Sequence, residues 1–396
     1  MSILIKHGRI WYQNKIRNLD ILIEKNKITK VANKIKTKAT KIIDASGLTI
    51  IPGLIDVHVH LREPGYEYKE TIKTGTLAAI AGGYSTICCM PNTNPVIDDL
   101  KSLKLLKKLI NQNAQTEVLP YVSITQKQKG ERLVNIPLLA KQCFAFSDDG
   151  VGLQSDRLMY QAMQKCYKVN KPIVVHCEDN SQVDNAKEYK EVERDIQFAL
   201  KCKCQLHICH ISTKESIHLI KKAKKNTKQI TCEVTPHHLL LNQNDVKDDG
   251  KYKMNPPLTD KQSQTALIKA VRDGTIDMIA TDHAPHSDLE KNTSYTKSLN
   301  GVVGLEFAFS LIYTHLVLKK IINFKRLIEL MSSNPAKIFH IKNAGEIKVG
   351  NLARLTFVDL HEKWKVDSET FCSKGHSTPF DGEQLISKIK RVLILP

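Results

Sequence analysis

The sequence lacks several features that would place it in a specialised class of protein. No run of about 18 uncharged apolar residues occurs, so no membrane-spanning helix is predicted. The opening segment, MSILIKHGRI, lacks the long apolar run and small-residue cleavage site of a secretory signal. The 10 cysteines are neither dense nor regularly spaced, which favours thiols over a disulfide framework. These absences predict a cytoplasmic protein.

Aromatic residues and arginines are also scarce. Aromatics make up 6% of the chain, and most of the 59 basic residues are lysines, which give a net charge of +18. The densest basic run, KKAKKNTK at 221–228, follows the helical pattern TKESIHLI, and cations complement the C-terminus of a helix. No aromatic residues interleave with these lysines as a stacking platform would require. We therefore predict a solvated helix end and no nucleic-acid partner.

The composition that remains is that of a globular enzyme-sized chain. Apolar residues make up 41% and charged residues 25% of the 396 residues, enough for one large domain and a smaller companion. Residues 1–52 contain short alternating stretches between turn residues, and a similar texture returns near the end of the chain. We predict a small β-sandwich formed by residues 1–52 and 344–396, with a catalytic domain at 53–343.

Within residues 53–343, apolar strands alternate with longer helical segments, which is typical of a parallel α/β sheet. The candidate strands are LIDVHVH, YSTICCM, EVLPYVS, CFAFS, PIVVHC, QLHICHI, ITCEVT and IDMIAT. Eight such units predict a (β/α)8 TIM-like barrel, in which the active site lies where the strands end.

The segment DVHVHLREPG at 56–65 carries the first chemical signal. In a strand, side chains at alternate positions share a face, so Asp56, His58 and His60 are predicted to point one way. Two imidazoles on one face suit a divalent metal. An isolated H-x-H is more often structural, so the interpretation depends on the other strand ends.

Polar residues that can bind metals recur at those ends. After the first, second, fourth, fifth, sixth and eighth strands come, in order, Arg62; Asn92; Asp148 and Asp149; His176; His210; and Asp282, His283 and His286. This recurrence predicts a metal-dependent site at the mouth of the barrel. Strand alternation does not decide between Asp148 and Asp149.

The motifs HLREPG, MPNTNP, FSDDG, VVHCEDN, EVTPHHLLL, YKMNPPL and TDHAPH resemble those of dihydroorotases of the long bacterial type, in the amidohydrolase superfamily. H-x-H alone marks the superfamily, whereas HLREPG with MPNT and KMNPPL is specific to dihydroorotases. The resemblance covers nearly the whole chain. It implies the reversible, zinc-dependent cyclisation of N-carbamoyl-L-aspartate to L-dihydroorotate in pyrimidine (UMP) biosynthesis.

The resemblance also implies roles for individual residues. The metal ligands would be His58, His60, Asp149, His176, His210 and Asp282, holding one or two Zn²⁺ ions, two being favoured, with Asp149 as the bridge. Asp282 would also be catalytic, as the proton shuttle. The substrate-binding residues would be His60, Arg62, Asn92, Asn255, His286, Asn300 and Gly301.

The chain departs from its relatives in ways that leave alternatives open. Many amidohydrolases have a carboxylated lysine after the fourth strand, where SDDG offers only aspartates, so the metal count is open. Asn300 stands where relatives have an aromatic residue, and the stretch from His176 to His210 is short. The alternatives are a hydantoinase or allantoinase, or a non-catalytic scaffold. A homodimer and an association with aspartate transcarbamoylase are the partner hypotheses.

Two further clusters are interpreted as structural. CKCQLHICH at 202–210 lacks the C-x2-C spacing of common zinc sites, and alternation places Leu206, Ile208 and His210 on one face. TPHHL at 235–239 has adjacent histidines, which would diverge to opposite faces of a strand. The cysteine pair in YSTICCM is predicted to be small core residues.

Overall fold

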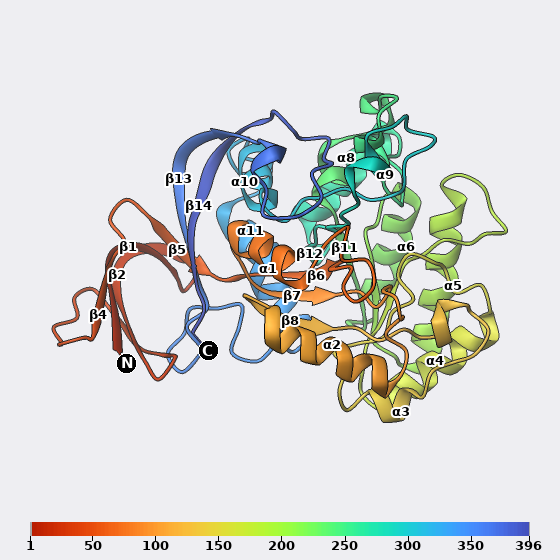
Figure 1. Cartoon of the computed structure of the whole chain (residues 1–396), viewed down its shortest axis with the longest axis horizontal. Coiled ribbons are helices and arrows are strands. Elements are labelled where there is room, and N and C mark those ends of the chain that lie inside the picture. The colour runs from red at the N-terminus through yellow and green to blue at the C-terminus, as the bar shows by residue number, and fades with distance from the viewer. Residues whose placement is uncertain (1, 396) are drawn as a thin grey trace.

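The computed structural model describes residues 2–395, and the first and last strands of the chain share one sheet (Figure 1). This seven-stranded sheet consists of β1 (Ser2–Tyr12), β2 (Lys15–Glu24), β3 (Lys27–Ala32), β4 (Lys41–Asp44), β5 (Thr49–Pro52), β13 (Leu355–Lys365) and β14 (Gln384–Leu393). Its order is β14-β13-β5-β1-β2-β3, and β4 pairs with β1 outside this path. The terminal segments therefore form the predicted β unit together, while the domain boundaries at residues 53 and 344 stay predictions.

Strand β1 changes partner halfway along its length. Its first half pairs with β4 and its second half with β5, and its register with β2 shifts between Ile5 and Gly8. A Cβ at Gly8 would lie 2.8 Å from Cδ1 of Ile50, so a larger residue would push the two strands apart. With this register shift and change of partner, the sheet packs around its own apolar core, which is rich in isoleucine.

The second unit is a closed parallel barrel. Its strands are β6 (Leu54–Val59), β7 (Tyr84–Cys89), β8 (Glu117–Pro120), β9 (Ile173–Val175), β10 (Leu206–Ile208), β11 (Ile230–Val234) and β12 (Met278–Ile279). Parallel bridges from Phe146 to Val122 and to Ile173 join the sheet β6-β7-β8 to the sheet β9–β12, and a Val59–His283 bridge closes the ring. The predicted fold class is confirmed, with the fourth strand reduced to the bridges made by Phe146.

Helices surround the barrel. They are α1 (Ile72–Ala81), α2 (Leu100–Asn113), α3 (Ile136–Leu139), α4 (Asp156–Lys168), α5 (Ala186–Cys202), α6 (Lys214–Lys224), α7 (Pro236–Leu240), α8 (Lys261–Asp273), α9 (Asp288–Lys291), α10 (Ala308–Ile312), α11 (Phe324–Ile328) and α12 (Asn334–Ile338). Eight of them begin after a side chain that accepts a hydrogen bond from the first turn, namely Thr71, Asp99, Asn135, Ser155, Thr213, Thr235, Asp260 and Asn323.

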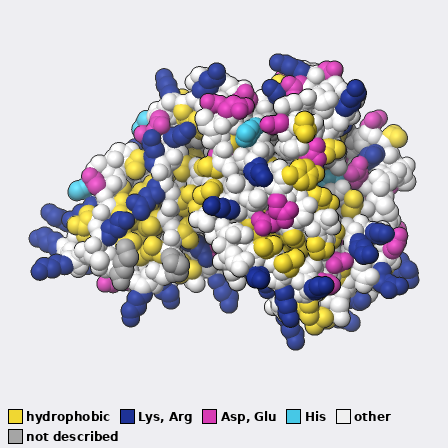
Figure 2. Space-filling model, in the orientation of Figure 1, with side chains coloured by type: hydrophobic (Ala, Val, Ile, Leu, Met, Phe, Trp, Pro, Cys, Tyr) yellow, Lys and Arg dark blue, Asp and Glu magenta, His cyan; other side chains and the backbone are white. Residues whose placement is uncertain are grey.

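The basic run at 221–228 begins in the last turn of α6, as predicted. Lys221 and Lys224 form ion pairs with Asp273 and Asp277, each at 2.5 Å. On the face shown in Figure 2, lysine and arginine side chains are dispersed over both parts of the molecule. Among the described residues, no helix is long and apolar enough to cross a membrane.

The barrel interior is filled by small and medium side chains from strands all around the ring. This cluster contains Ile55, Val57, Cys88, Met90, Tyr121, Ala145, Val174, Cys209, Met278 and Ala280. Cys88 and Cys89 are buried in the core, as expected, and all the cysteines are free thiols. The packed interior gives the strand ends above it a rigid base.

An ion pair fastens the terminal sheet to the barrel. Nη2 of Arg354, next to β13, lies 2.8 Å from Oε1 of Glu117, the first residue of β8, and the Nη1–Oε2 contact makes the pair bidentate. We expect Arg354→Met to lower the free energy of unfolding by about 1 to 3 kcal/mol, measured by equilibrium urea titration, because it leaves Glu117 without its charged partner. Arg391→Met, at an exposed position of β14, is the control. Equal losses in the two variants would contradict the fastening role.

Candidate metal centre and substrate cavity

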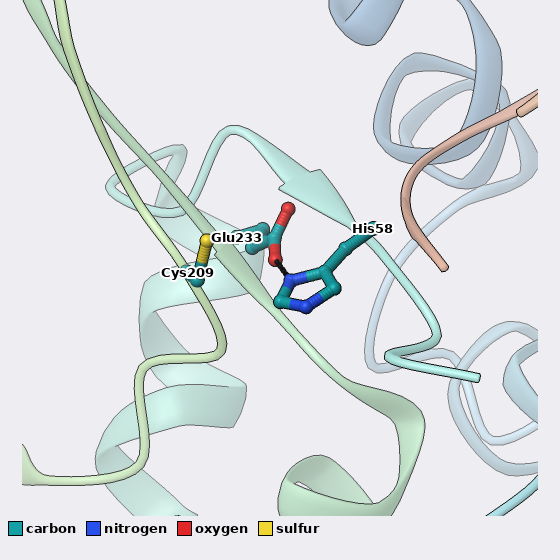
Figure 3. A group of neighbouring side chains, drawn as sticks. All are labelled: His58, Cys209 and Glu233. Atoms are coloured by element: carbon teal, nitrogen blue, oxygen red, sulfur yellow. Dashed lines mark hydrogen bonds and ion pairs between the residues drawn. The ribbon is translucent and has the colours of Figure 1, made fainter. Parts of the chain in front are cut away.

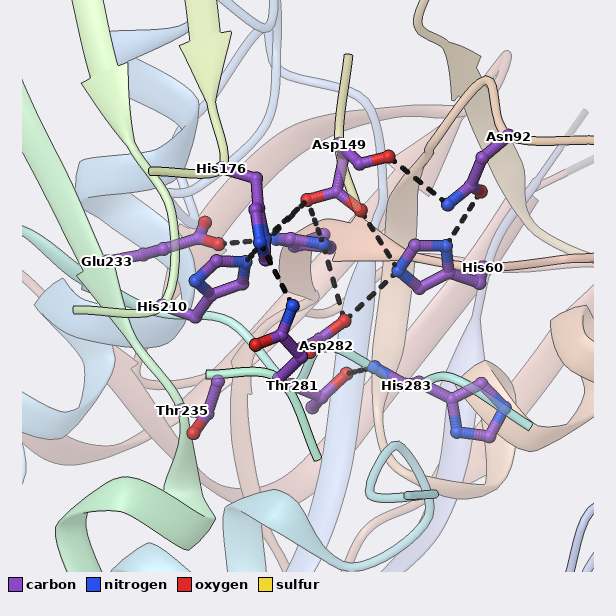
Figure 4. A network of polar contacts seen from close by, with 12 residues as sticks. His60, Asn92, Asp149, His176, His210, Glu233, Thr235, Thr281, Asp282 and His283 are labelled. Carbon is purple, nitrogen blue, oxygen red and sulfur yellow. Dashed lines mark hydrogen bonds and ion pairs between the residues drawn. The ribbon is translucent and has the colours of Figure 1, made fainter. Parts of the chain in front are cut away.

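Six side chains from five strand ends converge at the mouth of the barrel (Figure 4). Nε2 of His58 lies 3.3 Å from both Oδ1 of Asp149 and Oδ1 of Asp282, and Nε2 of His60 lies 3.1 Å from Oδ1 of Asp282. On the other side of Asp149, Nε2 of His210 lies 3.6 Å from Oδ1, and Nδ1 of His176 lies 2.9 Å from Nε2 of His210. Asp149 thus stands between two groups of donors.

These six residues fit a metal. Two ligand atoms that each lie about 2.0 to 2.1 Å from one tetrahedral ion are roughly 3.3 Å apart. The distances from His58 and His60 to the aspartates are 3.1 to 3.4 Å, and those among His176, His210 and Asp149 are 2.9 to 3.9 Å. Nε2 of His58 and Oδ1 of Asp149 are buried and have no hydrogen-bond partner, which is costly unless a cation satisfies them. All the donors are imidazole nitrogens or carboxylate oxygens, the ligand types that zinc accepts. The cluster is therefore suited to hold a metal ion.

Of the two adjacent aspartates, Asp149 is the one in the cluster. Asp148 turns the other way, where Oδ1 accepts hydrogen bonds from the backbone N–H groups of Ile124 and Thr125 and Oδ2 accepts one from the Thr125 hydroxyl. Asp148 therefore holds the loop after β8. Because these bonds turn Asp148 away, Asp149 is the aspartate that faces the cluster, which strand alternation alone could not decide.

Positive φ angles bring three of the predicted residues into the site. Arg62, His210 and Asp282 have φ of 61°, 32° and 49°. Such backbone costs of order 1 kcal/mol or more for residues other than glycine and is concentrated at functional sites. In strict alternation His210 would share the face of Leu206 and Ile208, which belong to the core outside the barrel interior. The turn at His210 directs its ring inward instead.

Strand β6 departs from simple alternation too. Its register with β7 shifts between Asp56 and Val59, and Val57 and Val59 join different core clusters. Asp56, predicted to point the same way as the two histidines, is not one of the six converging residues: its carboxylate accepts backbone N–H bonds from His58 and Thr281. The rings of His58 and His60 still both face the site, with centroids 5.3 Å apart.

Electrostatics keeps the two aspartates in the form that binds metal. Burial on its own raises the pKa of Asp149, but the charge of His58 and hydrogen bonds to His210 and His58 hold it well below its ordinary value. Burial is likewise opposed at Asp282, where His58 and His60 lower the pKa. Both side chains are therefore carboxylates next to a protonated His58, and a metal bound at Nε2 of His58 would replace that proton as the positive charge.

Behind His58 lies a buried glutamate on β11 (Figure 3). Oε1 of Glu233 lies 2.7 Å from Nδ1 of His58, and Oε2 lies 3.0 Å from Nε2 of His207. Burial opposes ionisation, but the two imidazoles lower the pKa of Glu233 to about 2. The carboxylate accepts the Nδ1–H of His58, which leaves Nε2 of His58 as a lone pair for a metal.

Cys209 lies beside this pair in Figure 3, so a thiolate site has to be considered. Burial raises the pKa of the Cys209 thiol well above its ordinary value, so it stays protonated. His207 also bonds to Thr231, with Nδ1 2.9 Å from Oγ1. These contacts support a structural role for the cysteine-rich segment 202–210.

Two more histidines of the cluster, His60 and His176, are oriented by neighbours. Oδ1 of Asn92 accepts from Nδ1 of His60 at 2.9 Å, so Nε2 of His60 faces the aspartates. Nε2 of His176 lies 3.3 Å from Oε2 of Glu178, and that oxygen also accepts from Nδ2 of Asn255 at 3.0 Å. Asn92 and Asn255, both predicted from the sequence, therefore contact the ligands directly.

A cavity of about 190 Å³ opens next to the metal cluster. It is lined by His60, Arg62, Asn92, Asp149, Gly150, His176, His210, Asn255, Asp282, Ala284, His286, Asn300 and Gly301. Every residue predicted to bind substrate is in this set. Only His58, which is 0% exposed, belongs to the predicted site without lining the cavity.

Arg62 supplies positive charge to this cavity. Its Nε donates to the carbonyl of Pro285 at 3.0 Å, which fixes the plane of the guanidinium. The carboxylates of Glu63 and Glu67 accept backbone N–H bonds from Ile72 and Gly65, so neither neutralises Arg62. One terminal nitrogen of Arg62, Nη2, lies 3.3 Å from Nε2 of His286. Among the described residues no carboxylate forms an ion pair with the guanidinium, whose planar fork suits a carboxylate best.

His286 lies next to Arg62 and is neutral. Burial, followed by the charges of Arg62 and Lys69, lowers its pKa to about 3. Its Nε2–H donates to the carbonyl of Asn300 at 2.8 Å, and Nδ1 accepts from Nζ of Lys69 at 3.2 Å. Lys69 is paired with Glu290 at 2.8 Å. His286 thus links the arginine side of the cavity to the loop that carries Asn300.

Gly301 contributes a bare backbone to the cavity wall. It has φ of 137°, and a Cβ would lie 2.6 Å from the carbonyl oxygen of Ala284 and 3.0 Å from Cδ2 of His286. Its own amide donates to the carbonyl of Lys253 at 3.0 Å. The position therefore requires glycine, and its N–H is already occupied.

The histidine pair of TPHHL does not lie in a strand, so the prediction of diverging side chains is wrong. Thr235 caps helix α7, with Pro236 in its first turn, and the two rings lie 4.5 Å apart. Nδ1 of His238 lies 2.7 Å from the Thr235 hydroxyl, and Nε2 lies 3.0 Å from the carbonyl of Pro256. His238 therefore fastens the loop that follows Asn255, which is a structural role.

Three charged residues near the site were missed in the sequence: Lys69, Glu178 and Glu233. Glu233 had a usable signal, since a glutamate inside the apolar strand ITCEVT must find a buried partner. Glu178 follows His176 in HCEDN, where Asp179 was an equal candidate. Lys69 had no signal, because its partners lie more than 200 residues away.

Comparisons with known proteins identify the family of this chain. Residues 47–201 match the family model described as "Dihydro-orotase-like". A dihydroorotase of Staphylococcus epidermidis is 45% identical, over 96% of this chain and 95% of its own length. One from Macrococcus caseolyticus is 42% identical, over 100% and 97%. The chain belongs to the dihydroorotase family.

Solved structures similar to this dihydroorotase-family chain come from related hydrolases. An L-hydantoinase (dihydropyrimidinase) of Arthrobacter aurescens superposes with a TM-score of 0.90 at 25% identity, covering 99% of this chain and 94% of its own. A dihydropyrimidinase of Brevibacillus agri has a TM-score of 0.89 at 20% identity, over 100% and 94%. The second likeness supports the barrel fold alone.

The role of Glu233 can be tested by metal binding. Glu233→Gln keeps the shape but weakens the acceptor for Nδ1–H of His58, so we expect affinity for Zn²⁺, used as the probe, to fall about 10- to 100-fold. Affinity is measured by competition with a chromophoric chelator. Glu117→Gln on β8, which contacts no histidine, should bind as the unaltered protein does. An unchanged affinity in Glu233→Gln would show that the glutamate only fills the core.

Proposed function

We propose that this chain is a dihydroorotase, which interconverts L-dihydroorotate and N-carbamoyl-L-aspartate. The observation that carries the proposal is a single cavity with a metal cluster on one side and an unneutralised arginine on the other. The substrate matches both, because it places a cyclic amide and a carboxylate on one small ring. Relatives 42 to 45% identical over nearly the full length carry the name dihydroorotase.

The metal is proposed to be zinc, with two ions per chain. His58, His60 and Asp282 would hold one, His176 and His210 the other, and Asp149 both. The ions would lower the pKa of a water molecule to about 7 and polarise the amide carbonyl. Neutral imidazoles and carboxylates are suitable ligands for this chemistry.

The side chains on the other wall would bind and orient the ring. Arg62 is placed to pair with the substrate carboxylate through its two terminal nitrogens, and neutral His286 beside it adds no competing negative charge. Asn92, Asn255 and the backbone around Asn300 offer hydrogen bonds for the ring amides. Holding the ring in this way brings its carbonyl to the metal side of the cavity.

Asp282 is proposed to move the proton. In ring opening, its carboxylate accepts a proton from the attacking water and delivers it to the ring nitrogen as the C–N bond breaks. In ring closure the same transfers run in reverse. Its position at the end of β12, with Oδ1 between His58 and His60 and the side chain on the cavity, suits both contacts.

Turnover of L-dihydroorotate by purified protein tests the proposal directly. We expect hydrolysis of L-dihydroorotate to be much faster than hydrolysis of hydantoin or allantoin, to stop after removal of metal by a chelator, and to return with Zn²⁺. Preference for hydantoin would favour the hydantoinase alternative that the structural neighbours represent. Full activity in demonstrably metal-free protein would contradict the assignment.

Substitution of Arg62 tests whether this residue binds the carboxylate of the substrate. Arg62→Met should cost roughly 2 to 5 kcal/mol of transition-state stabilisation for L-dihydroorotate, measured as kcat/KM, because it removes one partner of a buried charge pair. Arg62→Lys should recover only part, since a point charge cannot form the bidentate pair. Exposed Arg157→Met is the control. An unaltered kcat/KM in Arg62→Met would make the arginine structural.

Asp282→Asn tests the proton transfer. Asparagine keeps the size and one acceptor oxygen but takes up no proton at neutral pH, so kcat should fall about 10²-fold or more while the protein folds and keeps part of its metal. Asp277→Asn, immediately before β12 and paired with Lys224 outside the cavity, is the control. Near-wild-type kcat in Asp282→Asn would leave that residue as a ligand only.

The homodimer and the association with aspartate transcarbamoylase stay predictions. So does a cytoplasmic location.

A further inference from the structure

A buried lysine lies behind the substrate-binding wall. Lys291, the last residue of α9, is 1% exposed. Its Nζ donates to the carbonyl of Leu299 at 2.8 Å and to that of Lys253 at 3.2 Å. Among the described residues, no carboxylate forms an ion pair with it. A buried ammonium without a counter-ion is costly, so its hydrogen bonds must offset that cost.

The environment of Lys291 disfavours the charged form of its side chain. Burial lowers the pKa of Lys291 to about 7, the charge of Lys253 acts in the same direction, and Asp249 opposes them. Replacing the lysine by an apolar residue would remove this cost but would leave two loop carbonyls without their donor. The ammonium is thus retained at a position where the two backbone acceptors need it.

The two carbonyls belong to different loops, and both loops carry cavity residues. Leu299 precedes Asn300 and Gly301, and Lys253 lies two residues before Asn255. Lys291 itself follows the segment that carries His286. One side chain therefore joins three segments that are separated in the sequence and that meet at the substrate side of the cavity.

Further bonds show how closely these three segments are joined. The amide of Gly301 donates to Lys253 O at 3.0 Å, and the amide of Gly250 donates to Thr293 O at 2.9 Å. A Cβ at Gly250 would lie 2.2 Å from the carbonyl oxygen of Lys291, so the backbones are nearly in contact. Because the carbonyl of Asn300 is held by His286, residues 299, 300 and 301 are each fixed by a different partner.

We propose that Lys291 is a positioning residue for substrate binding: its side chain ties the loop at 299–301 to the loop at 253–255 and so preassembles the cavity wall that carries Asn255, Asn300 and Gly301. The substrate involved rests on the proposed function. Lys291 does not line the cavity, so it acts through Asn300, Gly301 and Asn255 rather than on the substrate. Its loss should weaken substrate binding more than it slows the chemical step.

Kinetics separate this role from general stabilisation. In Lys291→Met, which keeps the length and removes the donors, we expect KM for L-dihydroorotate to rise about 10-fold or more, with kcat within about threefold and metal content unaltered. Lys291→Gln, which keeps a shorter donor, should lie between Met and wild type. Lys297→Met, an exposed lysine of the same loop, should match wild type. Unaltered KM in Lys291→Met would overturn the proposal, and so would a fall in kcat and metal content without a rise in KM.

Hydrogen exchange gives a readout that does not depend on the reaction. In Lys291→Met, the amide of Gly301 should exchange at least about 10-fold faster, while the amides of β10 stay protected. Equal acceleration in both regions would mean a general loss of stability and would overturn the positioning role. If Lys291→Met does not fold, Lys291→Gln is measured in its place. If wild-type protein does not turn over L-dihydroorotate, the proposed function fails, and the exchange result still decides whether Lys291 ties the loops.

Discussion

Two buried carboxylates surrounded by four imidazoles are the feature on which the rest of the site depends. Asp149 and Asp282 lie within 3.1 to 3.6 Å of ring nitrogens from His58, His60 and His210, and the buried atoms Nε2 of His58 and Oδ1 of Asp149 have no hydrogen-bond partner. Such an arrangement is unfavourable in a dry interior unless cations lie between the donors. The strands below therefore hold at the barrel mouth a group of donor atoms that bound cations would stabilise.

The barrel holds these donor atoms in place through hydrogen-bond partners behind the histidines and through strained backbone at neighbouring residues. Glu233 and Asn92 select which nitrogen of His58 and His60 faces the cluster. Positive φ angles at His210 and Asp282 turn their side chains inward after short strands. A packed interior and the ion pair to the terminal sheet give these strained positions a rigid frame. Stability built elsewhere thus supports geometry that is locally unfavourable.

The sequence predicts much of this site because barrel chemistry is concentrated at strand ends. Eight apolar strands could be recognised, and polar residues at their ends had to meet once the barrel closed. What alternation could not predict is how a strand leaves the barrel. His210 reaches the site through a turn in the backbone. The Asp56 carboxylate accepts a hydrogen bond from the backbone amide of Thr281 and does not belong to the cluster.

Contacts between distant loops were beyond the sequence for another reason. Lys69 and Lys291 look like any of the many lysines of this chain, and only the folded structure shows that they are buried. The helix at TPHHL is similar, since adjacent histidines predict little until Thr235 and Pro236 are recognised as a helix start. Patterns that depend on chain periodicity were informative, and single residues whose role depends on tertiary contacts were not.

The central claim is that the cluster binds metal through nitrogen and oxygen atoms alone. X-ray absorption spectroscopy at the zinc edge, on protein loaded with Zn²⁺, measures the ligand atoms directly. The account predicts a first shell of nitrogen and oxygen at about 2.0 to 2.2 Å, with imidazole scattering beyond it. A sulfur shell at about 2.3 Å would contradict it, because it would place the metal on Cys209 or another thiolate instead of the six histidine and aspartate ligands.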